Sequence, residues 1–272
     1  MTRRAALAAI AGAGLAQKPV EFVCPMDTDI RSPHAGRCRR CGMKLVAGLP
    51  DPIEYPVSLE TRPRKLEVGK PCDLIFRVRD PRTLHAITKF ERIHEKLFHL
   101  FLVNQDLVTF AHEHPELQPE GSFRFRWTPP VGGEYRLLMD FYPEGATPQL
   151  ITRTLLLPVA DAHHSMGSAA GNLSVSLRTE PERPLAGQKT MLFFKLDPGT
   201  GLEPYLGAWG HLLAASEDLV DMLHAHPAWE EGGPTVQFNL IFPRPGLHRV
   251  WAQFQRSGVV NTVAFNVGVG QL

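Results

Sequence analysis

Alternation of apolar and polar side chains is the clearest pattern along most of this chain. In residues 72–79, Leu74, Phe76 and Val78 are set against Asp73, Arg77 and Arg79, which predicts a strand with one buried face and one wet face. Similar short segments follow one another between turn signals such as Pro129-Pro130. The first half of the chain is therefore predicted to form strands near residues 55–60, 72–79, 98–104, 107–113, 122–127, 134–142 and 149–158.

The same pattern occurs a second time. Residues 57–80 recur 118 positions later, residues 99–115 recur 112 positions later, and residues 125–141 recur 113 positions later. A longer loop in the first copy, near residues 81–98, accounts for the change in offset. We therefore predict a mostly β protein with two tandem sandwiches of immunoglobulin-like or cupredoxin-like type. The predicted repeats are residues 51–160 and 172–272, with a linker at 161–171.

Composition supports many short strands and narrows the classes of partner. The 272 residues are 43% apolar, enough for more than one core, and they include 24 prolines and 23 glycines. The formal charge of +1 gives no electrostatic reason to expect nucleic acid or an anionic membrane as a partner. After the first 16 residues no segment approaches the roughly 18 apolar residues of a membrane span, so none is expected in the mature form.

Residues 1–16 have the pattern of a cleaved export signal. Arg3 and Arg4 precede a run of small apolar residues that ends at Gly14-Leu15-Ala16, which predicts a mature start at Gln17. The two arginines fit a twin-arginine signal and an ordinary Sec signal equally well. We expect an exported protein, either periplasmic or secreted.

Sulfur-containing side chains gather in the next segment, a knuckle predicted at residues 17–50. Three cysteines in C-x13-C-x2-C spacing, with a methionine two residues after each outer cysteine, make up the group: Cys24, Met26, Cys38, Cys41 and Met43. Thiolates and thioethers are soft ligands, which favour Cu(I) and Zn(II) over hard cations. A disulfide would leave one of the three cysteines over, so the spacing favours a metal site.

The run Cys-Pro-Met, a basic loop and then Cys-x-x-Cys-Gly-Met-x-Leu resembles the heavy-metal-binding domain of copper and silver efflux adaptors and P-type metal ATPases. The resemblance covers residues 21–47 and implies that the knuckle binds Cu(I) or Ag(I), with Zn(II) as the alternative. The commonest form of that family has a histidine where this chain has Asp27. The fourth ligand is therefore open between His34, Asp27 and a methionine.

Histidines recur at matching positions of the two copies: His99, His112 and His114 in the first, and His211, His224 and His226 in the second. If Gln105-Asp106 is a hairpin tip, His99 lies directly opposite His112, and His114 shares their face. Three imidazoles in that arrangement suit Cu(II) or Zn(II). A hydrogen-bonded polar corner explains the same pattern, so these histidines form a second tier of candidate ligands.

Two smaller features can be explained without a metal site. His163, His164 and Met166 in the linker form either an auxiliary copper-binding patch or an exposed polar segment. Cys72 lies within a predicted strand, where a cysteine is expected to act as a small buried apolar side chain.

Signatures of enzymes are missing from the sequence. His94-Glu95 is followed by His99 after five residues, whereas a zinc protease needs the second histidine after four. We hypothesise an exported metal-binding protein, not an enzyme, that sequesters a heavy metal or hands it to a metal efflux or insertion protein. The alternative is an envelope protein-interaction module with a structural zinc knuckle. A metal-dependent enzyme at the histidines is a third hypothesis, because a three-histidine site leaves a coordination position for water.

Overall fold

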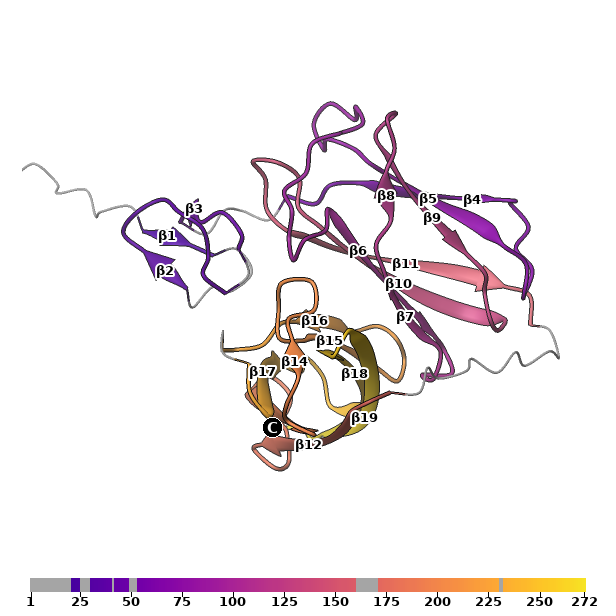
Figure 1. Ribbon diagram of the computed structural model, residues 1–272. Coiled ribbons are helices and arrows are strands. Elements are labelled where there is room, and N and C mark those ends of the chain that lie inside the picture. Colours follow the sequence, from indigo (N-terminus) through magenta and orange to yellow (C-terminus); the bar gives the residue numbers. More distant parts are fainter. Residues whose placement is uncertain (1–20, 25–29, 41, 49–52, 160–170, 230–231) are drawn as a thin grey trace, which may run out of the picture.

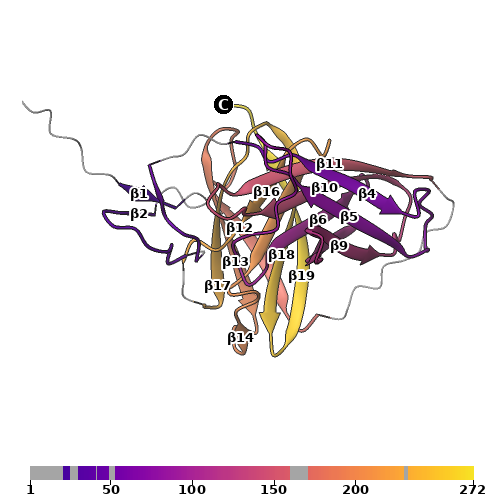
Figure 2. The same ribbon diagram turned by 90° about the horizontal axis from the view of Figure 1, so that it is seen from above.

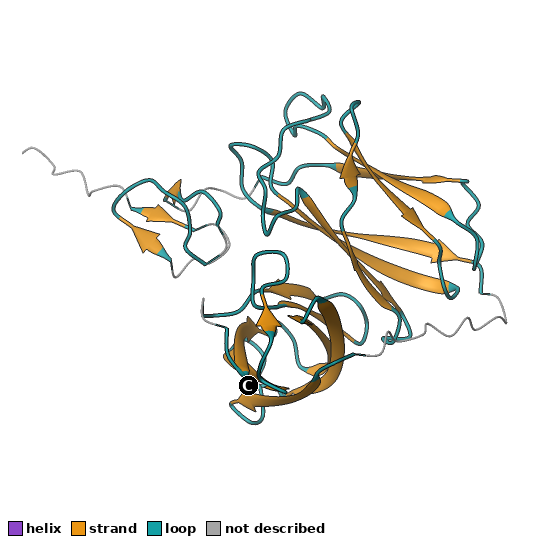
Figure 3. Cartoon of the chain, viewed as in Figure 1, coloured by secondary structure: helices purple, strands orange, loops and turns teal. Residues whose placement is uncertain are grey.

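A computed structural model describes residues 21–24, 30–40, 42–48, 53–159, 171–229 and 232–272. These residues form strands, turns and loops arranged as a small knuckle and two β-sandwiches (Figure 1, Figure 3). The prediction of a mostly β chain with two tandem sandwiches is thereby confirmed. Over the described ranges, no helix has the length and apolarity needed to cross a membrane.

The knuckle is a three-stranded antiparallel sheet in the order β2-β1-β3. Its strands are β1 (Phe22–Val23), β2 (Arg31–Ser32) and β3 (Val46–Ala47). So short a segment cannot enclose a core alone. Its buried cluster of Cys24, Cys38, Met43 and Leu45 is completed by two residues of the first sandwich, Ile93 and Tyr142.

The first sandwich consists of two four-stranded sheets, in the orders β4-β5-β9-β8 and β11-β10-β6-β7. The strands are β4 (Val57–Arg62), β5 (Cys72–Val78), β6 (Phe98–Asn104), β7 (Phe110–Glu113), β8 (Glu116–Leu117), β9 (Ser122–Trp127), β10 (Gly133–Phe141) and β11 (Gln149–Leu157). Phe76, Phe98 and Phe123 fill the space between the sheets. The predicted strands are found close to their expected limits, except that β7 begins three residues later than predicted because the turn before it is wider.

The second sandwich also consists of two sheets, and its strands run through the middle of Figure 2. One sheet has the order β12-β13-β17, and the other has the order β14-β18-β15-β16 with β19 paired to β18. The strands are β12 (Ser174–Glu180), β13 (Lys189–Asp197), β14 (Leu202–Glu203), β15 (His211–Ser216), β16 (Met222–Ala225), β17 (Thr235–Ile241), β18 (Gly246–Arg256) and β19 (Val259–Val269). Phe194, Phe238 and Phe254 lie in its core.

The two sandwiches pack against each other through the sheets that contain β6 and β15 (Figure 1). Every residue of these two strands is buried, so neither has a wet face. Phe101 and Val103 point away from their own core and pack against Leu213 and Trp251 of the second sandwich. The rings of Phe110 and Trp251 stack with their centroids 5.0 Å apart. The sequences of β6 and β15 do not identify this interface. An apolar strand indicates that both of its faces are covered, but not which element covers them.

Candidate metal centres

The thiols of the knuckle lie in a dry environment. Cys24 is 0% exposed and Cys38 is 2% exposed, and both belong to the same cluster as Met43. A tight turn follows Cys38: the Gly42 N–H donates to the Cys38 carbonyl over 2.9 Å, and Gly42 has a φ of +75°, which favours glycine. The fold therefore gathers two thiols and a thioether, the donor types that soft ions prefer.

The other predicted ligands of the knuckle remain predictions. Cys41, Met26 and Asp27 lie outside the described residues. His34 is exposed, and within the described segments it belongs to no group of three convergent metal donors.

The predictions for the linker residues and for Cys72 have different outcomes. The linker residues His163, His164 and Met166 also lie outside the described residues. Cys72 is buried in the core of the first sandwich, as predicted, and burial raises the pKa of its thiol to about 11.

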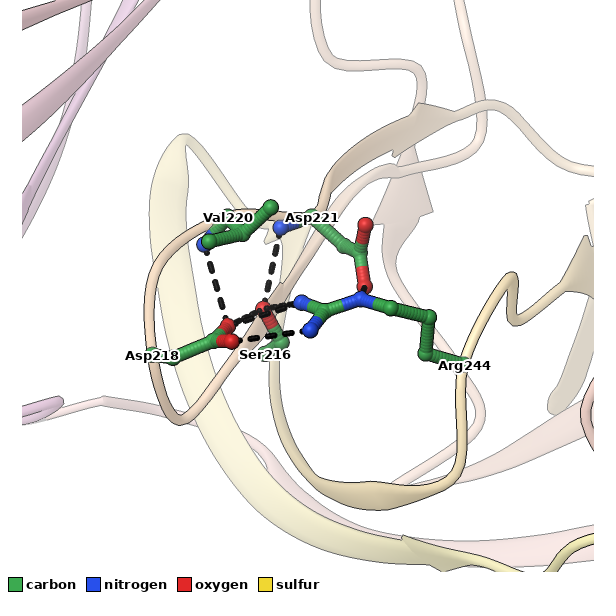
Figure 4. A network of polar contacts seen from close by, with 5 residues as sticks. All are labelled: Ser216, Asp218, Val220, Asp221 and Arg244. Atoms are coloured by element: carbon green, nitrogen blue, oxygen red, sulfur yellow. Dashed lines mark hydrogen bonds and ion pairs between the residues drawn. The ribbon is translucent and has the colours of Figure 1, made fainter.

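Hairpin turns with an aspartate fix the strands that carry the histidines. In the first copy the Asp106 carboxylate accepts hydrogen bonds of 2.8 Å from the N–H groups of Val108 and Thr109. In the second copy Asp218 accepts from the Val220 N–H, and its carboxylate pairs with Arg244 (Figure 4). The identical aspartates of the repeat are therefore turn residues.

The pairing register in both hairpins differs by two residues from the prediction. His112 lies opposite Phe101, and Leu100 lies opposite Glu113, so the turn is centred on Asp106-Leu107 and His99 faces the position of His114. Gln105-Asp106 is not the tip, because the Asp106 side chain closes a wider turn. A shift of two residues preserves the side-chain face, so the three histidines still share one face.

The ion pair in the second turn predicts a pH effect. The Arg244 side chain holds the pKa of Asp218 well below its ordinary value of 3.8. A carboxylate with a depressed pKa stabilises the fold above its unfolded pKa, and that contribution is lost as the pH falls through the folded pKa. We expect Arg244→Gln to raise the Asp218 midpoint toward 3.8, measured by carboxyl carbon NMR. Arg249→Gln, which removes an arginine that bonds Asn266 instead, should leave it unchanged; an unmoved midpoint in Arg244→Gln would contradict the assignment.

Two groups of three histidines are the convergent metal donors among the described residues. Each group offers three nitrogens that all lie within 4.8 Å of one another: His99, His112 and His114 form triad 1, and His211, His224 and His226 form triad 2. In triad 1 the Nδ1 atom of His99 lies 3.1 Å from the Nε2 atom of His112. Each triad comes from one hairpin, β6–β7 or β15–β16, and from the residue just after its second strand.

The interface brings the two triads together. The ring centroids of His112 and His211 lie 5.5 Å apart, and those of His99 and His224 lie 6.0 Å apart. A seventh histidine, His94, places its ring centroid 3.8 Å from that of His226. The sequence predicts one site inside each sandwich, whereas the structure places both at the surface where the sandwiches meet.

The outer nitrogens of four histidines have fixed partners. His99 Nε2 donates to the Ile93 carbonyl over 3.0 Å, and His211 Nε2 donates to the Tyr205 carbonyl over 2.9 Å. The other two bonds cross the interface.

The two hydrogen bonds that cross the interface involve Gln253 and Asp140, polar residues that the sequence analysis did not identify. His112 Nδ1 lies 2.7 Å from Gln253 Oε1, and His224 Nδ1 lies 2.7 Å from Asp140 Oδ2. Asp140 and Gln253 occupy equivalent positions of the repeat, 113 residues apart. The signal that could have identified them is a polar residue within a largely apolar stretch of β10 and of β18. Such partners orient an imidazole and select its tautomer.

Burial favours the neutral form of five of the triad imidazoles. It lowers the pKa of His99 to about 4 and that of His114 to about 3. Burial also lowers the pKa values of His112, His211 and His226 well below 6.5, and neighbouring histidines lower them further. Neutral imidazole is the form that binds metal.

A cavity of about 210 Å³ leads to triad 2. It is lined by His226 and Trp209 of the second sandwich and by Arg39 and Arg40 of the knuckle. Residues of the knuckle and one histidine of triad 2 therefore line the same cavity.

Protein-family models match the knuckle and the two sandwiches separately. Residues 22–47 match the model of the heavy metal binding domain. Residues 52–154 and 168–271 each match one model, described as Domain of unknown function (DUF8832). No curated protein matches the sequence.

Solved structures share the sandwich arrangement only distantly. The chain is similar to the adhesin InvE of Yersinia pseudotuberculosis, with 10% identity and a TM-score of 0.27 over 79% of this chain and 60% of that one. It is also similar to the Escherichia coli adhesin FdeC, with 16% identity and a TM-score of 0.25 over 84% of this chain and 68% of that one. A two-domain fibronectin type III segment of chicken tenascin matches with 14% identity and a TM-score of 0.23 over 79% of this chain and 99% of that one. Likenesses at this level have no bearing on function.

Proposed function

This chain belongs to the family described as Domain of unknown function (DUF8832), and on that premise we propose that it is an exported heavy-metal-binding protein. Its knuckle takes up Cu(I) or Ag(I), and the protein sequesters the ion or hands it to a metal efflux or insertion protein. The observation that carries the proposal is that residues 22–47 match the heavy metal binding domain and bury Cys24 and Cys38 in one cluster.

The chemistry of this cluster favours a soft ion. Cys24 and Cys38 offer thiolates, and the buried Met43 offers a thioether close by, whereas oxygen donors would be needed for a hard cation. Cys41 is the proposed third thiolate. Zn(II) is the alternative ion, since thiolates also bind it well.

Export and a non-enzymatic role complete the proposal. The basic start and small apolar run of residues 1–16 support export. The sequence has none of the catalytic signatures sought, which supports binding in place of catalysis.

One observation favours a second candidate function, an envelope interaction module in which the knuckle is a structural zinc site. Ile93 and Tyr142 of the first sandwich complete the buried cluster of the knuckle. An ion at Cys24 and Cys38 would then mainly hold the knuckle against the sandwich, and removing it would loosen that contact.

Replacing Cys24, Cys38 and Cys41 together with serine separates these functions. We expect Cu(I) bound by the full chain, measured by competition with a chromogenic chelator, to fall by about one ion per chain because serine does not supply a thiolate. Cys72→Ala, which changes the cysteine of the sandwich core, is the matched control and should retain the ion. Full Cu(I) binding by the triple variant would reject the proposal. Zn(II) binding alone, with loss of thermal stability on its removal, would support the interaction module.

A further inference from the structure

A second metal centre lies between the sandwiches, at residues that the knuckle does not use. We infer that triad 1 and triad 2 each hold one divalent transition-metal ion of the Cu(II) or Zn(II) kind, as a paired centre enclosed by the two repeats. The inference goes beyond the proposed function and stands on different residues, so either can fail without the other.

Triad 2 gives the most direct observation. His224 Nδ1 donates to the Asp140 carboxylate and His211 Nε2 donates to a carbonyl, and these partners can only accept. In a ring that carries one proton, this bond leaves a lone pair on the other nitrogen, which is His224 Nε2 or His211 Nδ1. Both atoms, and His226 Nε2, are buried with no hydrogen-bond partner within the described part of the chain.

Triad 1 shows the same need for a cation. His99 Nε2 donates to the Ile93 carbonyl, so His99 Nδ1 carries a lone pair. With the Gln253 oxygen facing His112 Nδ1, His112 Nε2 also carries one, and these two lone pairs face each other over 3.1 Å. A tetrahedral ion with bonds of about 2.0–2.1 Å holds its nitrogens about 3.3 Å apart, so one ion fits between them. His114 Nε2 is a third buried nitrogen with no hydrogen-bond partner in the described segments.

A hydrogen-bonded polar corner does not explain these contacts. Such a corner would pair its buried nitrogens with donors, because each unsatisfied buried group costs about 1–3 kcal/mol. Here the outward nitrogens of four rings face protein oxygens, and the inward nitrogens of His114, His211, His224 and His226 have no hydrogen-bond partner among the described residues. That division, with protein groups outside and lone pairs inside, is the arrangement of metal-binding histidines.

The paired centre is incomplete without both repeats. Gln253 of the second sandwich orients His112 of triad 1, and Asp140 of the first sandwich orients His224 of triad 2. Asp140 and Gln253 are thus positioning residues that act across the interface. Occupied triads would tie the sandwiches together, and separated sandwiches would lose both outer partners.

The donor set determines the class of ion. Neutral imidazoles without a thiolate suit borderline ions such as Cu(II) and Zn(II) better than Cu(I) or Mg²⁺. His226 of triad 2 lines the cavity that Arg39 and Arg40 of the knuckle also line.

The test uses the full chain with Cys24, Cys38 and Cys41 replaced by serine, stripped with a chelator and reloaded with Zn(II) or Co(II). We expect about two Zn(II) per chain by mass spectrometry, and Co(II) absorption bands of tetrahedral nitrogen coordination without thiolate charge-transfer bands. In this background His114→Asn and His226→Asn should each remove about one ion, and together they should remove both. His85→Asn, at an exposed histidine of the first sandwich, should keep both ions.

Asp140→Asn tests positioning separately from ligation. It keeps every imidazole, and we expect the Zn(II) affinity of triad 2 to fall about 10- to 100-fold while the ion count at saturation is unchanged. The chain with all histidines intact carries no histidine substitution, so its Co(II) spectrum tests the inference even if a histidine variant fails to fold. If that chain binds no Co(II) or Zn(II), or if the two asparagine variants bind as much as it does, the inference is overturned.

Discussion

Replacing Trp251 with alanine is expected to make the two sandwiches unfold separately. Trp251 is 2% exposed, stacks on Phe110 of the first sandwich and belongs to the cluster that joins the two repeats. Truncating a buried tryptophan typically costs about 3–5 kcal/mol, and here most of that loss falls on the interface. We expect calorimetry of the metal-free chain to show one transition for the wild type and two for Trp251→Ala.

Trp229→Ala is the matched control for that experiment. Trp229 is 67% exposed, so its removal should leave one transition near the temperature of the wild type. The same Trp251→Ala chain should lose affinity for Zn(II) at both triads, because separated sandwiches no longer supply Asp140 and Gln253. A single transition at lower temperature with unchanged Zn(II) binding would show that Trp251 supports only its own sandwich.

Replacing His224 with alanine is expected to destabilise the metal-free protein strongly. Asp140 is 0% exposed, and its Oδ2 atom lies 2.7 Å from His224 Nδ1. Its other carboxylate oxygen has no hydrogen-bond partner within the described residues, so the change leaves a buried carboxylate without that imidazole. Leaving a buried carboxylate without its hydrogen-bond donor costs more than the roughly 1–3 kcal/mol of an unsatisfied neutral group. Urea unfolding in the presence of a chelator measures this free energy of unfolding.

The repeat itself provides the control for this change. His112→Ala removes the equivalent ring of triad 1 but leaves the neutral amide of Gln253, so we expect a smaller cost of about 1–3 kcal/mol. Adding Asp140→Gln to His224→Ala should recover much of the lost stability, because glutamine is the residue that the second repeat carries at that position. Equal costs for the two alanine changes would mean that the Asp140 charge does not matter.

Much of the fold follows from local patterns. Alternation such as that of Leu74, Phe76 and Val78 predicts strand β5, and it succeeds because side chains alternate between the faces of a strand. The internal repeat predicts two sandwiches, and the spacing of the cysteines predicts the knuckle. Even the hairpin histidines were placed on the correct face, since the error in register was two residues.

The candidate sites were predicted only in part. His99, His112 and His114 were expected to converge, and they do, but the sequence did not indicate that triad 2 lies against triad 1. Asp140 and Gln253 were missed because their partners are 84 and 141 residues away and belong to the other repeat.

The amino-acid sequence determined the strands, the duplication and the ligand types of this protein, because each depends on residues close together along the chain. Tertiary structure alone decided that two histidine triads share one interface and that the knuckle completes its core with Ile93 and Tyr142. These contacts form between surfaces of separately folded units, and the shape of such surfaces leaves no periodic pattern in the sequence.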